Sequence, residues 1–300
     1  MATSWHQLSK EIKTTIDHAG KSIVAVDGRA GHTSSGIVWR KDFVITASHS
    51  IRQDTGIRVI LSADQSVQAR LAGRDRGSDI ALLKLEGEVK SPQAEFGSTA
   101  ELAVGDFTVA VARTRRGNLV ASSGIISGLM GEWKVHRTRI DQFIRPDITL
   151  YPGFSGGALV GADSKLLGLN TSGFLRGKSI TIPSSTLTGI AEQIAQTGHV
   201  VRPYLGLVMQ PVQIPESLRT SAGVNSDTGL LVMHVERGAP ADVAGVLIGD
   251  ILLNIDGTSL DDLQDLHAVL DSKGVGEEVS VSLVRGGKLI QSAIKIGARP

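Results

Sequence analysis

A serine lies in a glycine-rich turn near the middle of the chain, in the stretch YPGFSGGAL at residues 151–159. Such a turn presents the Ser155 hydroxyl outward and directs the backbone N–H groups of Gly153 and Ser155 to one side. An acyl-transfer nucleophile and its oxyanion donors need this arrangement, so Gly153, Phe154 and Ser155 form the predicted oxyanion hole. Glycine and serine are also ordinary turn residues, so a plain β-hairpin turn explains the stretch equally well when it is taken alone.

Two other residues favour the chemical interpretation. His49 ends the strand-like run VITASH, and Asp79 opens the apolar run DIALLKL. An imidazole exchanges protons near neutral pH, so His49 can take the Ser155 proton and return it to a leaving amine. The Asp79 carboxylate would fix the tautomer of the ring and stabilise its charged form. Each residue alone has an ordinary explanation in a loop or turn, but the three contexts in this chain order favour a His49–Asp79–Ser155 triad.

The composition excludes several other kinds of protein. The 300 residues are 41% hydrophobic, carry a formal net charge of +1 and include no cysteine. The chain is therefore long enough for two domains with real cores, and it has neither disulfides nor thiolate metal sites. The near-zero charge gives no electrostatic case for nucleic acid as a partner. The sequence lacks the H-E-x-x-H pattern of metal hydrolases, so we expect no metal and no cofactor.

The elements that must position these residues are mostly short strands. A helix with one apolar face is predicted over residues 4–19, and another over 185–196. Between them, short apolar runs with period two are separated by turn residues, which is typical of a β-barrel or β-sandwich. The predicted strands cover residues 22–26, 35–39, 43–47, 58–61, 67–71, 80–85, 107–112, 119–128, 137–144, 158–160, 166–170 and 179–182.

The pattern changes after residue 203 to that of a small α+β module. Strands are predicted at residues 205–209, 230–235, 250–255, 279–284 and 289–296, with a short helix from Pro240, a longer one over 261–273, and a loop before residue 230. We therefore divide the chain into an N-terminal helix (1–21), a β domain (22–198), a linker (199–203) and the α+β domain (204–300).

The motifs resemble those of one protease family. Residues 22–198 resemble the trypsin-like domain of HtrA/Deg proteases, and residues 204–297 resemble the PDZ domain that follows it. The resemblance rests on the stretches SSGIV (34–38), ITASH (45–49), SDIALLK (78–84), GFSGGAL (153–159) and LGLNT (167–171). It implies a mostly β chain, with a chymotrypsin-like double β-barrel whose triad lies between the barrels, followed by a small α+β PDZ domain. The chain departs from the family pattern at Ser50, Tyr151 and Phe154, where valine, asparagine and asparagine are common.

The same resemblance suggests a substrate pocket. Trypsin-like pockets have the residue six positions before the nucleophile at their base, and here it is the uncharged Thr149. Cleavage after Lys or Arg is therefore not expected, because a buried cation would lack a partner. We expect small or medium aliphatic side chains before the scissile bond, and residues 170–173 pairing with the substrate as an added strand. The predicted pocket consists of Ile148, Thr149, Leu150, Asn170, Thr171, Ser172 and Gly173.

A second binding site is predicted in the α+β domain. The stretch YLGL, Tyr204, Leu205, Gly206 and Leu207, resembles the loop with which PDZ domains bind a peptide carboxylate. The peptide would lie as an extra strand between residues 205–209 and the helix 261–273. In that helix Leu263 and His267 complete the predicted groove. A plain edge strand is the alternative explanation of the four-residue motif.

These observations lead to a serine endopeptidase that acts on unfolded or damaged polypeptides, with peptide C-termini as partners of the PDZ domain. The alternative is a peptide-binding scaffold or holdase with a silent protease domain, for which Phe154 is the sequence hint. The resemblance implies a homotrimer formed through N-terminal segments. The sequence has no run of apolar residues long enough for a membrane helix and no recognisable export signal, which predicts a cytoplasmic protein, or an extracytoplasmic one if an N-terminal segment has been removed.

Overall fold

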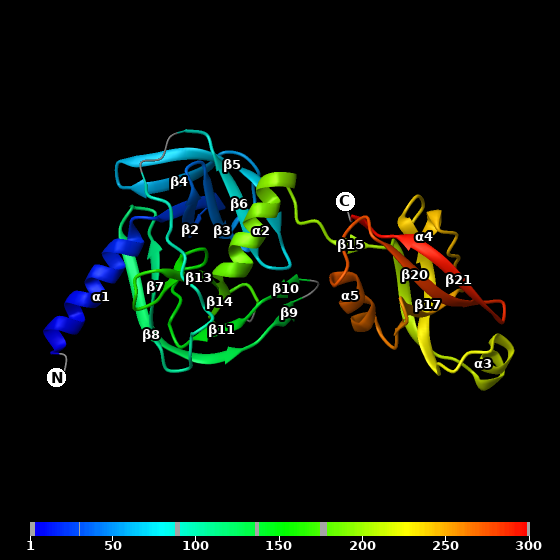
Figure 1. Cartoon of the computed structure of the whole chain (residues 1–300). Helices are drawn as coiled ribbons and strands as arrows, with labels where there is room; N and C mark the ends of the chain where they lie inside the picture. The colour runs from blue at the N-terminus through cyan, green and yellow to red at the C-terminus, as the bar shows by residue number, and fades with distance from the viewer. Residues whose placement is uncertain (1–3, 30, 88–90, 136–137, 175–178, 299–300) are drawn as a thin grey trace. The chain divides into compact units, whose positions relative to one another are not determined.

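The computed structural model describes residues 4–29, 31–87, 91–135, 138–174 and 179–298 (Figure 1). The contacts divide the chain into two compact units, Met1–Val200 and Val201–Pro300. The passage between them lies within residues 199–203, where the sequence predicts a linker. Among the described residues, no helix is both long enough and apolar enough to cross a membrane.

Six antiparallel strands close the first barrel in the order β1-β2-β3-β6-β5-β4. Alternating apolar residues such as Ile57 and Val59 fill its interior, because successive side chains of a strand point to opposite faces. The strands are β1 (Ile23–Arg29), β2 (His32–Arg40), β3 (Phe43–Ala47), β4 (Ile57–Ser62), β5 (Gln65–Asp75) and β6 (Ile80–Leu85).

The second barrel closes in the order β11-β14-β13-β12-β7-β8, and the predicted double β-barrel is thereby confirmed. Its strands are β7 (Phe107–Arg113), β8 (Leu119–Met130), β11 (Phe143–Pro146), β12 (Ala158–Val160), β13 (Leu166–Thr171) and β14 (Ile180–Pro183).

One strand prediction in this barrel is wrong. Residues 138–144 do not form the end of one continuous strand, and residue 137 lies outside the described part of the chain. The run is divided into β10 (Thr138–Ile140), which pairs with β9 (Trp133–Val135), and β11. The break falls at Asp141, whose N–H donates to Thr186 Oγ1 at 3.0 Å. After pairing with β9, the chain therefore contacts helix α2 (Ser184–Thr197) through Asp141 before β11 pairs with β8.

The two barrels share a core with the helices of the same unit. This core joins Ile45 and Leu82 of the first barrel to Val111 and Leu169 of the second. Helix α2 (Ser184–Thr197) packs on β5, β6 and β13, and ends at Gly198 with φ +81°. The shared core fixes the ends of strands from both barrels relative to one another.

Helix α1 (Trp5–Gly20) packs on the same core through its C-terminal half. Ser4 caps the helix by accepting from Gln7 N–H at 3.2 Å, while Ile12 and Ile16 contact the core. Trp5, in contrast, is 86% exposed at the start of the helix.

The second unit is built on a sheet in the order β16-β17-β18-β20-β21, with β19 paired to β18. Its strands are β15 (Pro203–Tyr204), β16 (Leu207–Gln213), β17 (Thr228–Val235), β18 (Ile251–Ile255), β19 (Thr258–Ser259), β20 (Glu278–Arg285), β21 (Lys288–Lys295) and β22 (Gly297–Ala298), with β15 pairing β22. Its helices are α3 (Glu216–Ala222), α4 (Pro240–Val243) and α5 (Leu263–Asp271). The loop predicted before residue 230 is wrong in part, because it contains α3.

Candidate active site

His49 and Asp79 meet because they stand at the adjacent ends of two paired strands. Ala47 of β3 pairs with Ile80 of β6, and His49 follows in a short 3₁₀ turn, Ser48–Ser50. His49 Nδ1 lies 2.7 Å from Asp79 Oδ2, and the His49 backbone N–H donates to Asp79 Oδ1 at 2.8 Å. A carboxylate on Nδ1 keeps the proton there and leaves Nε2 as the basic nitrogen.

The loop before β6 holds Asp79 in a fixed position. Asp79 has a left-handed backbone conformation, with φ +57°, and its carbonyl accepts from Ser48 N–H at 2.9 Å. The carboxylate of Asp75 shapes the loop by accepting from the N–H groups of Gly77 at 3.3 Å and Ser78 at 3.1 Å. The Asp79 side chain is 7% exposed, so its carboxylate depends on these fixed partners instead of on water.

Thr171 occupies a different place from the one predicted. The sequence puts it in the substrate pocket, but Thr171 is fully buried and its hydroxyl donates to Asp79 Oδ2. Its Oγ1 also accepts from Gly173 N–H at 2.9 Å. A β-strand of the second barrel thus completes the environment of a carboxylate that belongs to the first. Thr171 is therefore a positioning residue for the His49–Asp79 pair.

The turn before Ser155 leaves two backbone donors available. Phe154 N–H donates to Tyr151 O at 3.0 Å across a turn with Pro152 second and Gly153 third, at φ +97°. In the described part of the chain, the N–H groups of Gly153 and Ser155 have no hydrogen-bond acceptor. The Phe154 amide is used in the turn and its side chain is only 2% exposed, so the amides of residues 153–155 that stay available are those of Gly153 and Ser155.

Ser35 of β2 anchors this turn, a role that sequence reasoning missed. Its N–H donates to Ser155 O at 2.9 Å, and its hydroxyl donates to Gly153 O at 2.8 Å. The same hydroxyl accepts from Arg113 N–H at 3.0 Å, and the residue is fully buried. Gly156 is required beside it, because a Cβ there would lie 2.0 Å from Ser35 O. A serine directly before the apolar run Gly36–Trp39 of β2 is the signal that could have revealed Ser35.

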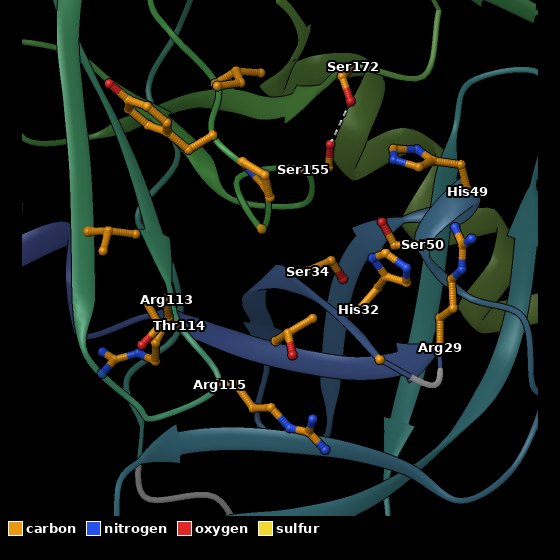
Figure 2. Close-up of a pocket in the computed structure, with 17 residues that line it drawn as sticks. Arg29, His32, Ser34, His49, Ser50, Arg113, Thr114, Arg115, Ser155 and Ser172 are labelled. Carbon is orange, nitrogen blue, oxygen red and sulfur yellow. Dashed lines mark hydrogen bonds between the residues drawn. The ribbon is translucent and has the colours of Figure 1, made fainter.

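Ser155 lies beside His49 and faces a second hydroxyl. Figure 2 shows Ser155 Oγ directed at Ser172 Oγ, 3.2 Å away, with the His49 ring on the same side of the cavity. His49 is 39% exposed and borders two cavities, of about 570 Å³ with Ser155 and about 350 Å³ with Gly173. Ser155 and His49 thus line one open cavity.

The other predicted pocket residues are dispersed. Leu150 and Ser172 line the larger cavity and Gly173 lines the smaller one. Ile148 packs with Phe154 in the barrel core and Asn170 is fully buried, accepting from Thr181 Oγ1 at 2.8 Å. Thr149 is exposed, which differs from the predicted position at a pocket base. Consecutive residues of this extended segment alternate between core and solvent, so Ile148 turns inward and Thr149 outward.

The predicted residues of the second unit surround an unpaired sheet edge. Strand β16 is the last strand of its sheet, and α5, with Leu263 and His267, packs beside it. In the part of the unit that the structure describes, the N–H groups of Leu205 and Gly206 donate to no acceptor, and Leu207 begins the edge strand. Gly206 has φ +82°, and a Cβ there would lie 2.2 Å from the Ala239 Cβ. Tyr204 donates its hydroxyl to Glu236.

Two closed barrels with a histidine, a buried aspartate and a serine at their junction define the class of trypsin-like serine peptidases. Residues 34–169 match the trypsin-like peptidase domain, and residues 203–296 match the PDZ domain. The chain belongs to the HtrA family of serine proteases, and it is a serine endopeptidase with a C-terminal PDZ domain.

The similarity to relatives extends along most of the chain. A putative serine protease HhoB of Synechocystis is 31% identical over 286 residues, covering 91% of this chain and 68% of the relative. A probable periplasmic DegP-like serine endoprotease of Hahella chejuensis is 31% identical, covering 90% of this chain and 58% of the relative. The solved serine endoprotease from Yersinia pestis has a TM-score of 0.73 at 25% identity, and all of both chains is covered.

Proposed function

We propose that Ser155 is the nucleophile, His49 the general base and acid, and Asp79 the residue that orients His49. Ser155 Oγ attacks the scissile carbonyl carbon while His49 Nε2 takes its proton, and the carbonyl π electrons move to the oxygen. His49 then returns that proton to the leaving amine as the C–N bond breaks, leaving an acyl ester on Ser155. In the second half, His49 takes a proton from a water molecule that attacks the ester carbon, and it gives this proton to Ser155 Oγ as the C–O bond to Ser155 breaks and the acid leaves.

The N–H groups of Gly153 and Ser155 stabilise the tetrahedral oxyanion in both halves of the reaction. A donor aimed at a developing oxyanion contributes about 3 kcal/mol to the transition state. The observation that carries the proposal is the coincidence of this pair of unused donors with the 2.7 Å His49–Asp79 hydrogen bond beside Ser155.

The substrate we propose is an extended polypeptide, as in unfolded or damaged proteins. Residues Ser172 and Gly173 follow strand β13 and border the cavities at His49, where an added strand could pair with the chain before the scissile bond. Leu150 lines the larger cavity and brings no charge to it, which supports small or medium aliphatic residues at the cleaved position. A folded protein cannot present such a segment without local unfolding.

The PDZ unit is proposed to bind the C-terminus of a polypeptide. The carboxylate would accept from the N–H groups of Leu205 and Gly206, and the peptide would extend the sheet at the open edge of β16. Leu263 is 37% exposed on α5 and supplies apolar surface for the last side chain. Such binding would recruit substrates or regulate the protease unit.

We further propose that the protein acts outside the cytoplasm as a homotrimer. The relative from Hahella chejuensis is named as periplasmic, and the predicted cytoplasmic location finds no support among such relatives. The exposed Trp5 at the start of α1 is available for contacts between copies. Light scattering of the wild type and Trp5→Ala tests the assembly, with a trimer mass expected for the first and a smaller mass for the second. A monomeric wild type would contradict it.

A second candidate function is a peptide-binding holdase whose protease unit is silent. The Ser155–Ser172 hydrogen bond favours it, because it engages the nucleophile with a hydroxyl instead of the imidazole. The test is turnover of casein by the wild type and Ser155→Ala. Protease function predicts degradation that the variant loses, whereas suppression of client aggregation by both proteins without degradation would support the holdase.

A further inference from the structure

The larger cavity at Ser155 carries an excess of positive charge. Its ionisable lining residues are Arg29, His32, His49, Arg113, Arg115 and Tyr151, and none of its lining residues is acidic. In Figure 2, Arg29, His32 and Arg115 lie on the side of Ser155 away from Ser172. Arg29 ends β1, His32 begins β2 and Arg115 lies in the turn between β7 and β8, so two hairpins from different barrels supply them.

The Arg113 guanidinium is occupied by hydrogen bonds within the protein. Its guanidinium donates to the backbone carbonyls of Ile23 at 2.5 Å, Gly117 at 2.6 Å and Gly20 at 2.7 Å. Burial lowers the pKa of Arg113 from its ordinary value. This side chain therefore ties α1 and two hairpins together beneath the cavity and has little capacity left for a ligand.

The guanidinium groups of Arg29 and Arg115 have fewer partners within the protein. Arg115 Nη2 lies 3.0 Å from Asp27 Oδ2, but the same carboxylate oxygen lies 3.8 Å from Arg58 Nη2. One carboxylate thus faces two guanidinium groups. Arg29 has no acidic partner in the part of the chain that the structure describes. The side of the cavity that Arg29, His32 and Arg115 line therefore keeps positive charge that no carboxylate of the described residues neutralises.

This side of the cavity lies where the substrate continues after the scissile bond. The chain before that bond is proposed to pair with Ser172 and Gly173, on the other side of Ser155. An extended chain must then leave over Gly153 toward the start of β2. A Cβ built on Gly153 would lie 3.4 Å from Thr33 O, so β2 adjoins the oxyanion turn. The leaving-group half of the substrate thereby enters the basic part of the cavity.

We infer that Arg29 and Arg115, whose guanidinium groups lie apart on the basic side of the cavity, form a subsite region that favours acidic side chains, Asp or Glu, at the positions on the C-terminal side of the scissile bond. The inference rests on the proposed role of Ser155 as nucleophile. A guanidinium and a carboxylate form charge-assisted hydrogen bonds, which solvent weakens at a half-open site. We expect an acidic residue to raise kcat/KM about five- to tenfold over its neutral isostere, and high salt to reduce this advantage.

Internally quenched peptides test the subsite with the full chain. They share the residues before the scissile bond, have amidated C-termini and carry Glu, Gln or Lys at the positions after it. The wild type should prefer Glu over Gln and disfavour Lys. Arg29→Gln and Arg115→Gln should each reduce the ratio of kcat/KM for the Glu peptide over the Gln peptide, and labelling of Ser155 by a fluorophosphonate shows that the variants fold. Arg70→Gln, an exposed arginine outside the cavity, removes the same charge and should keep the preference.

A further peptide has Gln and a free C-terminal carboxylate close to the scissile bond. Preference for this peptide over the Glu peptide would assign the subsite to a chain terminus and overturn the side-chain inference. Equal cleavage of the Glu, Gln and Lys peptides would overturn it while leaving the proposed protease function intact. If no peptide is cleaved and Ser155 reacts with no fluorophosphonate, the inference and the proposed function fail together.

Discussion

Gly173→Ala should disable the catalytic pair without removing any catalytic group. A Cβ at this position would lie 2.6 Å from Asp79 Oδ2 and 2.9 Å from His49 Nδ1, where ordinary contacts need at least 3.4 Å. The pair must therefore yield by about 0.8 Å. A misplacement of about 1 Å costs about 100-fold in rate, or about 2.7 kcal/mol of transition-state stabilisation. We expect kcat/KM to fall about 100-fold.

The assay combines steady-state peptide turnover with the rate of fluorophosphonate labelling. The reagent needs no extended substrate, so a parallel loss in both measurements assigns the effect to the catalytic pair and not to pairing of a substrate strand with Gly173. Gly189→Ala is the matched control, because a Cβ at this exposed helical position meets nothing within 4 Å. The control should keep full activity and gain about 1 kcal/mol of stability or less. A Gly173→Ala variant within threefold of wild type would refute the reasoning.

Three further variants test other contacts. Ser172→Ala should speed labelling of Ser155 roughly 2- to 10-fold by removing a competing neutral hydrogen bond, and slower labelling would instead mean that this bond assists the nucleophile. Ser35→Ala should lower kcat and destabilise the protease unit by about 1–3 kcal/mol in urea unfolding, because it leaves buried backbone groups unpaired; unchanged values would contradict its anchoring role. Arg285→Met should destabilise the PDZ unit by about 2–3 kcal/mol. The Arg285 guanidinium donates to both Asp250 oxygens at 2.7 and 2.6 Å, and without it the Asp250 carboxylate, which is 1% exposed, would be buried without a partner charge. The hydrogen bond to Asp250 raises the pKa of Arg285, so the stabilisation from its charge is lost only at strongly alkaline pH and should be constant from neutral to mildly alkaline pH in urea titrations; a loss over that range would contradict the pairing.

The barrel strands were predictable because their signal is local. Alternating apolar residues between turn residues mark most of them, and His49 and Asp79 stand at the ends of two such runs. The break at Asp141 was missed because a helix residue far along the chain, Thr186, determines it. Helix α3 was missed because it has only 7 residues, of which Leu218 and Ala222 pack against a core cluster, and this is too short a stretch for a helical pattern to be recognised.

The supporting contacts of the site could not be predicted in the same way. Thr171 reaches Asp79 across 92 positions and Ser35 reaches Gly153 across 118, and no local pattern encodes such distances. The pocket residues were placed by analogy from their distance to Ser155. Side chains in residues 145–149 alternate between solvent and the core, and this places Thr149 in solvent. A count of positions before Ser155 does not reveal such an orientation. Sequence patterns thus predicted the three residues of the proposed triad, whereas packing between the barrels determines which side chains hold them in place.

The most direct measurement is the intact mass of the protein after reaction with a fluorophosphonate, followed by peptide mapping. The account predicts a single phosphonyl adduct on Ser155, formed at least 100-fold more slowly in His49→Ala, because the hydroxyl is reactive only beside the imidazole. An adduct on another residue, or labelling of Ser155 at the same rate without His49, would contradict it.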